Sequence, residues 1–385
     1  MRTLYSLLLI TSILLSGCSS KSLLSSDDGS DASFPKKNKT GNGKGRQAEA
    51  GVVTAGEWND LNNWEFYKKT LAEKDFSSYV TQWQMYTNHR IAVMVKANDK
   101  PVTNVSVTLL RNDSPIWRAK TDNLGRAELW VGAFQKETEL NTAALRLTVN
   151  EQWVEHAPIS EKEVNIITLH TPPPTPSNVV QLAFMVDATG SMSDELEFLK
   201  MDLQKVIGEV EKTNSLLQIN TATIFYRDKG DEYVVRQSGF TNNIKHTIDF
   251  IGKQEANGGG DFPEAVDKAL EALNSLEWNA NARTRIAFMV LDAPPHKEEE
   301  VIKSVQTSVQ AAASKGIKLI PIVASGIDKS TEFLMRFMAI YTNGTYVFIT
   351  NDSGIGNNHI KPSVGEYQVE KLSNLMVRLI KKYSE

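Results

Sequence analysis

The sequence predicts an α/β fold, a doubly wound and mostly parallel sheet with helices on both faces, preceded by a small antiparallel β-sandwich. Two apolar runs, Val179–Val186 and Ile286–Leu291, are long enough for strands that are buried on both faces. Apolar residues spaced three and four apart from Leu196 to Val210 predict an amphipathic helix after the first run. Short β-rich runs without helical patterns fill the region between Ile91 and Val131. The two halves of the chain therefore predict two kinds of folded part.

Residues 1–18 have the composition of a secretory signal. A positive start, Met1-Arg2, precedes an apolar core, Leu4–Leu15, which is too short to span a membrane comfortably. The quartet that ends at Cys18 resembles the bacterial lipoprotein signal, in which the cysteine is lipidated and becomes the first mature residue. Cys18 is also the only cysteine of the chain. The resemblance implies a lipid anchor with acyl chains such as palmitate, which would hold the protein to the membrane of a bacterial cell envelope.

The residues after Cys18 predict where the anchored protein lies. Ser19 stands where an Asp would favour retention at the inner membrane, so the outer membrane is the expected address, with the surface and periplasmic faces both open. Residues 19–50 are rich in Ser, Gly, Asp, Lys and Asn, which predicts a flexible linker. The chain has 42 Lys and Arg against 46 Asp and Glu, a net charge of -4. This balance gives no reason to expect a nucleic acid as partner.

Residues 51–89 form an aromatic lead-in segment, in which Leu61–Leu71 is expected to be helical or irregular and to pack on the strands after it. Residues 90–170 contain the short strands of the expected β-sandwich. Within them, the stretch 100–105 and the turn 121–126 resemble carboxypeptidase-regulatory (transthyretin-like) or bacterial Ig-like modules. Asp122 and Asn123 in that turn are interpreted as turn residues, with calcium ligation as the alternative. The Pro-rich residues 171–177 predict a stiff linker to the second part.

Residues 178–385 carry the alternating strands and helices of the predicted doubly wound sheet. Beyond the elements already named, we expect strands at 221–228, 317–323 and 345–349, and helices at 265–273, 298–315, 330–341 and 366–383. The continuous apolar strands and the helices between them are typical of a parallel sheet. In such sheets ligands bind at the carboxyl ends of the strands.

Short oxygen-bearing side chains lie where two of these strands end. Asp187, Thr189 and Ser191 come after the first apolar run, and Asp292 comes after the second. A glycine-rich turn, Gly258-Gly259-Gly260-Asp261, lies between them in sequence and would let the backbone approach a bound ion closely. Hydroxyl and carboxylate oxygens are the ligands of hard cations such as Mg²⁺. The sequence therefore predicts a metal site at this edge.

These loops, in this order and after these strands, resemble the von Willebrand factor A domain with its metal-ion-dependent adhesion site. The resemblance covers about Asn178 to Glu385. It implies that Asp187, Thr189, Ser191 and Asp292 hold Mg²⁺, with Mn²⁺ or Ca²⁺ as alternatives, through direct hydroxyl ligands and carboxylates that often act through water. It further implies one open coordination position, which a carboxylate of a protein partner fills.

The glycine-rich turn departs from this family pattern. Gly260 stands where the family commonly has a Thr ligand, and the neighbouring Asp261 is either a substitute ligand or the N-cap of the next helix. Ser191 and Ser193 could also cap a helix, and Asp292 could cap the turn into the helix at 298–315. The sequence alone leaves these alternatives open.

The function predicted from these features is binding of a protein partner through a divalent cation, without catalysis. The alternative is a metal-independent scaffold for envelope complexes, which the missing ligand at Gly260 would favour. A third hypothesis, a metal-assisted hydrolase using His296 with Ser191 and Asp292, lacks the Gly-x-Ser-x-Gly elbow of serine hydrolases. The sequence also lacks a Walker-type phosphate loop and a His and Cys cluster suited to zinc.

Overall fold

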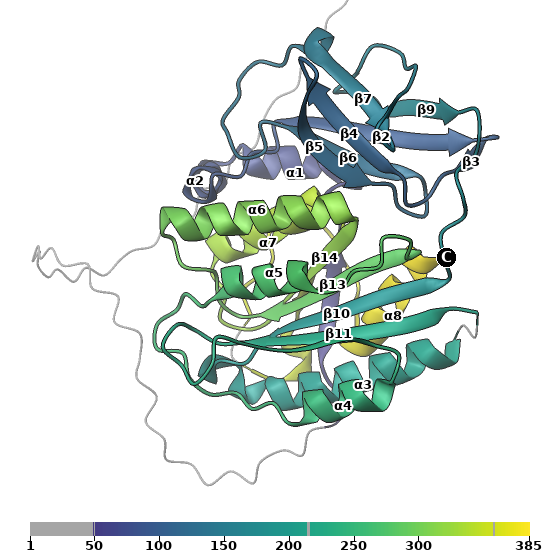
Figure 1. The fold of residues 1–385 in the computed structure, drawn as a ribbon. Coiled ribbons are helices and arrows are strands. Elements are labelled where there is room, and N and C mark those ends of the chain that lie inside the picture. The colour runs from purple at the N-terminus through teal and green to yellow at the C-terminus, as the bar shows by residue number, and fades with distance from the viewer. Residues whose placement is uncertain (1–48, 50, 214–215, 357–358) are drawn as a thin grey trace, which may run out of the picture. The chain divides into compact units, whose positions relative to one another are not determined.

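The computed structural model describes residues 49, 51–213, 216–356 and 359–385 (Figure 1). The predicted signal peptide, the lipidation site Cys18 and all of the linker 19–50 except residue 49 lie outside the described residues. Residues 47–385 form one compact unit. None of the helices in the described ranges is long and apolar enough to cross a membrane.

An eight-stranded sheet dominates the carboxyl-terminal half and has the doubly wound, mostly parallel character that the sequence predicts (Figure 1). From one edge to the other its strands are β12 (Val235–Thr241), β11 (Gln218–Tyr226), β10 (Val179–Asp187), β13 (Thr284–Leu291), β14 (Ile317–Val323), β15 (Tyr346–Ile349), β1 (Thr54–Trp58) and β16 (Val369–Lys371). The five strands from β11 to β15 run parallel, and β12, β1 and β16 run antiparallel to their neighbours.

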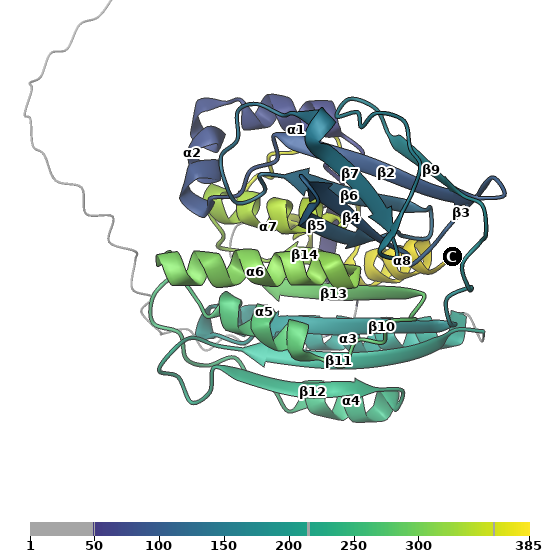
Figure 2. The same cartoon turned by 45° about the horizontal axis from the view of Figure 1, so that its top comes forward.

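Helices cover both faces of this sheet (Figures 1 and 2). One face carries α3 (Leu196–Thr213), α4 (Ile244–Gly252) and α8 (Leu372–Ser384), and the other carries α5 (Val266–Ser275), α6 (Glu299–Lys315) and α7 (Lys329–Tyr341). Along β10, Leu182 and Phe184 belong to the core on the first face, whereas Ala183 and Met185 belong to the core on the second. This alternation explains why β10 is apolar at nearly every position.

The segment 51–89 does more than lead into the β-sandwich. Its residues Thr54–Trp58 form β1, which pairs with β15 on one side and with β16 on the other. Gly56 lies opposite Phe348, and a Cβ at this position would lie 2.6 Å from the phenyl ring. The sheet therefore takes a strand from the far end of the folded chain, which no local pattern in the sequence could reveal. Two helices come after β1, α1 (Trp64–Leu71) and α2 (Lys74–Trp83).

The end of the chain also differs from the expectation of one helix over 366–383. Residues Val369–Lys371 form β16, and α8 begins only at Leu372. The backbone N–H of Leu372 donates to the carbonyl of Val53, next to β1, at 2.9 Å. Pairing with β1 thus ends the extended segment and sets the start of the helix.

The region between β1 and the Pro-rich segment forms two four-stranded sheets (Figure 2). One contains β2 (His89–Ala97), β3 (Lys100–Pro101), β6 (Arg126–Val131) and β9 (Asn165–Leu169), and the other contains β4 (Ser106–Arg111), β5 (Ser114–Lys120), β7 (Leu145–Val149) and β8 (Gln152–Trp153). The pairing is antiparallel except between β2 and β9, which run parallel. The family resemblance of this module stays a prediction.

These smaller sheets share one hydrophobic core with α5, α6 and α7. The Tyr341 hydroxyl on α7 donates to the carbonyls of Tyr86 and Ala133, at 2.9 and 3.0 Å. The indole N–H of Trp83 donates to Ser330 Oγ at 2.9 Å. The two modules are therefore joined by buried contacts as well as by the Pro-rich segment.

The turn at Asp122 is held by its own carboxylate. Asp122 Oδ1 accepts the backbone N–H groups of Leu124 and Arg126, both at 2.9 Å, as an Asx-type turn residue does. Its Oδ2 accepts from the side-chain amide of Asn343 at 3.0 Å. These contacts agree with the interpretation of Asp122 as a turn residue.

Candidate metal-binding site

The predicted site residues are delivered by two adjacent parallel strands. Asp187 is the last residue of β10, and Asp292 comes directly after the last residue of β13. The register pairs Val186 with Val290, so both aspartates reach the same edge of the sheet. This edge is the carboxyl end of the parallel strands, where the predicted site was expected.

Asp187, Thr189 and Ser191 are connected by hydrogen bonds within one loop. Asp187 Oδ1 accepts the backbone N–H of Thr189 at 2.9 Å and the Thr189 hydroxyl at 2.7 Å. Thr189 Oγ1 lies 3.1 Å from Ser191 Oγ. Asp187 and Thr189 are fully buried, whereas Ser191 is exposed. The loop thus runs from a buried carboxylate to a hydroxyl at the surface.

The two aspartates lie in a medium that opposes their ionisation. Burial is the main cause that raises the pKa of Asp187 to about 6, and the hydrogen bonds from Thr189 act in the opposite direction. Burial, and then the charge of Asp187, raises the pKa of Asp292 well above its usual value, while the Ser191 hydroxyl lowers it. Asp187 Oδ2 and Asp292 Oδ1 are buried without a hydrogen-bond partner among the described residues. Two unpaired carboxylate oxygens on one edge are costly unless a cation or a proton compensates them.

Glu264 joins this group, although we did not identify it from the sequence. It is 3% exposed, and its Oε2 lacks a hydrogen-bond partner in the part of the chain that the structure describes. Burial, together with the smaller effect of the charges of Asp187, Asp228, Asp292 and Asp231, raises its pKa to about 9. Its backbone N–H donates to the Pro294 carbonyl at 2.9 Å, which ties it to the loop after β13. The signal in the sequence was its place directly after the glycine-rich turn.

The glycine-rich turn packs against these side chains. A Cβ on Gly259, where φ is +69°, would lie 2.8 Å from Glu264 Oε1 and 3.2 Å from Thr189 Cβ. Gly260, by contrast, has open space where a Cβ would stand. Gly259 therefore permits a close approach of the turn to the Glu264 and Thr189 side chains, whereas its predicted approach to a bound ion stays a prediction.

The interpretation of Asp261 as a helix N-cap is wrong. Helix α5 begins at Val266 with Ala265 as its N-cap, because Phe262, Pro263 and Glu264 extend the turn before the helix starts. Asp261 is exposed, and no hydrogen bond or ion pair links it to the other site residues in the ranges described. Asp261 stays a predicted ligand, whereas Glu264 is the carboxylate that the turn brings to the buried edge.

The other capping alternatives also differ from the structure. Ser191 and Ser193 lie in a short 3-10 turn, η2 (Gly190–Asp194), before α3 begins at Leu196. The N-cap of α6 is Glu298, six residues after Asp292. Neither Ser191 nor Asp292 is therefore held in place by a capping role.

His296 pairs with a different aspartate from the one that the hydrolase hypothesis requires. Its Nε2 lies 2.8 Å from Asp228 Oδ1. The neighbouring Asp231 carboxylate accepts the backbone N–H groups of Asp228 and Gly259, at 3.0 and 2.8 Å. These contacts join the loop after β11 to the glycine-rich turn, and they leave Ser191, His296 and Asp292 without a catalytic triad's hydrogen bonds.

The donor set combines carboxylates with hydroxyls. Among the described residues, no three His, Cys, Asp or Glu side chains are grouped so as to hold a metal ion by themselves. The hydroxyls of Thr189 and Ser191 are neutral oxygen donors next to the buried carboxylates. Such a mixture suits Mg²⁺, which binds through few carboxylates and keeps several waters. Asp187, Asp292 and Glu264 each keep a buried carboxylate oxygen without a hydrogen-bond partner in the described part of the chain, and a cation beside Asp187 and Asp292 would compensate such oxygens.

The raised pKa values predict how the metal-free stability changes with pH. Both folded-state pKa values, about 6 for Asp187 and about 9 for Glu264, lie above the usual values of 3.8 and 4.5. The unfolded chain therefore loses these protons first, and the free energy of unfolding falls as pH rises from about 4 to about 9. Asp187 accounts for a loss on the order of 1–3 kcal/mol in the free energy of unfolding, and this loss takes place between about pH 4 and 6.

Chemical denaturation of the chain in a chelating buffer across this pH range measures the effect. Replacement Glu264→Gln should flatten the decline between pH 6 and 9, and the exposed control Glu300→Gln should leave it unchanged. A decline of the same size in the Glu264→Gln chain would show that Glu264 is not the titrating group.

Comparison with known proteins points to the von Willebrand factor A family, which the site loops also resemble. Residues 181–354 match the family model of the von Willebrand factor A domain. An ariadne-like RING finger protein of Acanthamoeba polyphaga mimivirus is 40% identical over 201 residues, which are 48% of this chain and 20% of that protein. The alpha-protein kinase vwkA of Dictyostelium discoideum is 28% identical over 207 residues, 53% of this chain and 32% of the kinase. The chain thus spans a third or less of the length of these relatives.

Two solved structures are similar at lower identity. A von Willebrand factor type A protein from Catenulispora acidiphila has a TM-score of 0.39 at 14% identity. The match covers 54% of this chain and 43% of that protein. The conserved hypothetical protein BatB from Bacteroides thetaiotaomicron has a TM-score of 0.38 at 14% identity and covers 53% of this chain and 98% of its own. On the match of the family model, the region 181–354 of this chain is a von Willebrand factor A domain.

Proposed function

We propose that the von Willebrand factor A domain of this chain binds a protein partner through a divalent cation. Asp187, Thr189, Ser191 and Asp292 would hold the cation, and Glu264 would lie beside them as a further carboxylate. The observation that carries the proposal is the set of buried carboxylate oxygens without partners on Asp187, Asp292 and Glu264, within the ranges described. Bound there, the cation would offer a positive charge and an open coordination position to a carboxylate of the partner.

The protein's own residues would prepare this site in two ways. The hydrogen bonds from Thr189 fix one oxygen of Asp187, and interaction with the buried Tyr226 hydroxyl also favours the charged form of this carboxylate. Asp187 and Asp292 are buried in a medium of low dielectric constant. The attraction between their charges and a cation is therefore stronger than at an exposed site. The exposed Ser191 marks where the site opens to a partner.

The location of this function rests on the sequence signal at Cys18. We infer that the lipidated chain is anchored in a bacterial envelope, in the outer membrane. Globomycin, which blocks cleavage of lipoprotein signals, should leave a larger precursor in cells that make the chain. A Cys18→Ser chain should lose lipid labelling by palmitate, and an unchanged label would contradict the anchor.

Calorimetric titration of the full-length chain with Mg²⁺ tests the cation directly. We expect saturable binding that weakens roughly 10-fold to 100-fold or more in Asp187→Asn and Asp292→Asn chains, because each loses a charged oxygen ligand. The control Asp249→Asn removes an exposed carboxylate on α4 and should bind as the parent does. The heat should also depend on the buffer, because cation binding releases the protons that the raised pKa values retain.

The same titration separates the proposal from the scaffold alternative. Gly260 provides no side-chain ligand, and this observation favours a metal-independent scaffold as the second candidate. Equal and weak heats in the parent and in both site variants would contradict the metal-dependent function. Partner capture that persists in a chelating buffer would then support the scaffold.

A further inference from the structure

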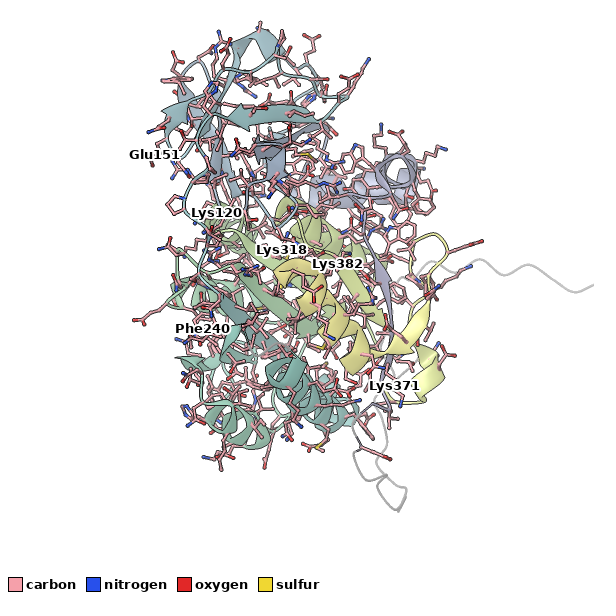
Figure 3. The ribbon with its side chains drawn as sticks, turned by 90° about the vertical axis from the view of Figure 1, so that its right-hand side faces the viewer. Lys120, Glu151, Phe240, Lys318, Lys371 and Lys382 are labelled. Carbon is pink, nitrogen blue, oxygen red and sulfur yellow. The ribbon has the colours of Figure 1, made fainter. Side chains whose placement is uncertain are left out.

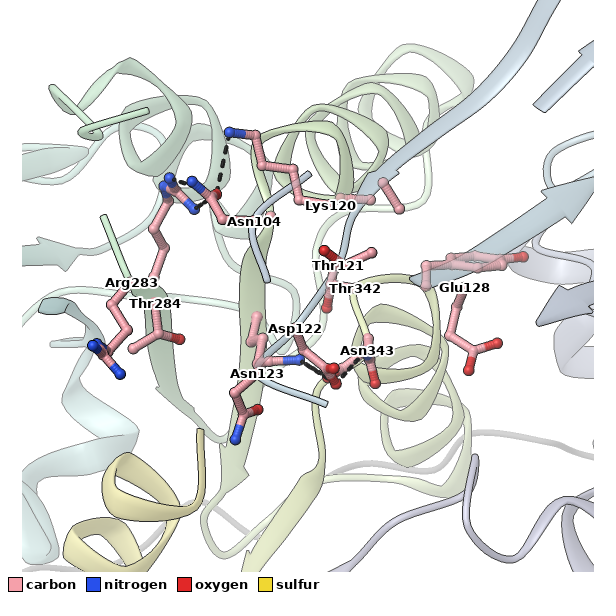
Figure 4. Close-up of a pocket in the computed structure, with 16 residues that line it drawn as sticks. Asn104, Lys120, Thr121, Asp122, Asn123, Glu128, Arg283, Thr284, Thr342 and Asn343 are labelled. Atoms are coloured by element: carbon pink, nitrogen blue, oxygen red, sulfur yellow. Dashed lines mark hydrogen bonds and ion pairs between the residues drawn. The ribbon is translucent and has the colours of Figure 1, made fainter. Parts of the chain in front are cut away.

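A recess lies at the edge of the large sheet opposite to the metal-binding edge (Figure 4). Its inner cavity has room for only about 20 Å³ of water-sized groups, within about 470 Å³ of space that includes open solvent. It is bordered by the loops around β4 and β5 and by the amino ends of β13 and β14. Its lining includes four basic residues, Lys120, Arg283, Arg285 and Lys318, and two acidic ones, Asp122 and Glu128. The recess therefore carries an excess of positive charge.

Lys120 and Arg285 come from different modules and converge on the same two acceptors. Lys120 Nζ donates to Asn104 Oδ1 at 3.3 Å and to the Ala280 carbonyl at 3.0 Å. The Arg285 guanidinium donates to Asn104 Oδ1 at 3.1 Å from both terminal nitrogens and to the Ala280 carbonyl at 2.6 Å. Figure 4 shows the Lys120 ammonium pointing toward Asn104. Two cationic groups therefore lie side by side on neutral oxygens.

The acidic residues of the recess pair with basic residues other than Lys120 and Arg285. Asp122 Oδ2 lies 3.7 Å from Lys318 Nζ, and Glu128 forms a 2.7 Å ion pair with Arg90. Over the residues that the structure describes, neither Lys120 nor Arg285 has an ion pair with a carboxylate. Burial, and then the charge of Arg285, lowers the pKa of Lys120 to about 8, and burial lowers that of Arg285 to about 10. The positive charge on this side of the recess is not neutralised by the described part of the protein.

Close packing holds the Lys120 side chain in this place. A Cβ on Gly316, where φ is +71°, would lie 2.8 Å from Lys120 Cβ. Arg285 is 3% exposed and also donates from Nε to the Asn279 carbonyl at 2.9 Å. The two cations are thus fixed by their surroundings rather than free to separate in solvent. Figures 3 and 4 show the position of Lys120.

We propose that Lys120 and Arg285 bind a small inorganic anion of halide size, which joins the β-rich module to the von Willebrand factor A domain. Two adjacent, partly desolvated cations without a carboxylate are stabilised by an anion, and the shared acceptors hold them close enough for one anion to contact both. The inner space of the recess is narrow, which favours chloride over a larger ligand. This proposal is independent of the divalent cation at the opposite edge.

Broadening of the ³⁵Cl resonance of chloride by the full-length chain tests this site, with chloride as the probe. We expect broadening that depends on protein concentration and falls by at least half in Lys120→Gln and in Arg285→Gln chains. The control Lys245→Gln removes an exposed lysine of α4 that pairs with Asp249 and should leave the broadening unchanged. Equal broadening in all four chains would overturn the proposal.

A second measurement applies even if a variant folds poorly. Crystals of the parent chain soaked in bromide should show an anomalous peak in contact with both Lys120 Nζ and the Arg285 guanidinium. Bromide peaks elsewhere on the surface with none at this position would also overturn the proposal.

Discussion

A chain that begins at residue 178 is expected to lose cooperative unfolding, because it lacks β1. This strand pairs with β15 and β16 at once, so its removal leaves β16 without a neighbour in the sheet and leaves β15 paired with β14 alone. The cut also removes the module that shares a core with α6 and α7, and it would expose side chains such as Phe333 and Phe337. Thermal unfolding followed by circular dichroism, with the chain that begins at Gln47 as the reference, measures the effect. A cooperative transition at the same temperature in both chains would contradict the role of β1.

A single methyl group tests β1 within the intact chain. In Gly56→Ala, the new Cβ would meet the Phe348 ring at 2.6 Å, and we expect a loss of about 1–3 kcal/mol in the free energy of unfolding. Gly239→Ala on β12 is the matched control, since nothing lies within 4 Å of its new Cβ. Urea denaturation should separate the two variants, and equal stability would show that β1 can move away from β15 without cost.

Loss of the buried ion pair between Asp60 and Arg336 is expected to lower the free energy of unfolding strongly. Arg336 Nε donates to Asp60 Oδ2 at 2.9 Å and a terminal nitrogen donates to Oδ1 at 2.6 Å, with Asp60 4% and Arg336 0% exposed. Asp60→Ala would leave the Arg336 guanidinium buried with its strongest partner removed. We expect a loss of about 3–5 kcal/mol in the free energy of unfolding.

A double variant distinguishes the buried charge from the lost packing. Asp60→Leu with Arg336→Met removes both charges and should recover much of the stability that Asp60→Ala loses. Asp249→Ala removes the acid of an exposed ion pair with Lys245 and should change stability by less than about 0.5 kcal/mol. Chemical denaturation compares the three chains, and a small effect of Asp60→Ala would show that Glu332 and the Ser363 carbonyl suffice for Arg336.

The sequence predicted those parts of the fold whose cause is local. The apolar runs of β10 and β13 are buried on both faces; β10 ends at Asp187 and β13 is followed by Asp292, the two aspartates of the predicted site. Most strands and helices between 178 and 349 could be read from the same patterns, but β12 (Val235–Thr241) and α4 (Ile244–Gly252) were not expected from the sequence. Asp187 and Asp292 could therefore be assigned to one edge before any contact was known.

Features that depend on distant contacts could not be predicted in this way. β1 contains five residues, and its identity as a strand depends on partners at 346–349 and 369–371. Glu264 lies between the glycine-rich turn and α5, and only the packing of Gly259 against Thr189 and Glu264 shows that its carboxylate turns toward the buried edge. The pairing of His296 with Asp228 likewise joins loops 68 residues apart.

Location of the cation by anomalous scattering from Mn²⁺ tests the central claim most directly. Crystals of the chain grown with Mn²⁺ should show one anomalous peak bounded by Asp187, Thr189, Ser191 and Asp292, with Glu264 beside it, and the peak should vanish in Asp187→Asn. A parent crystal that binds Mn²⁺ only at other carboxylates, such as the exposed Asp249 on α4, would contradict the account.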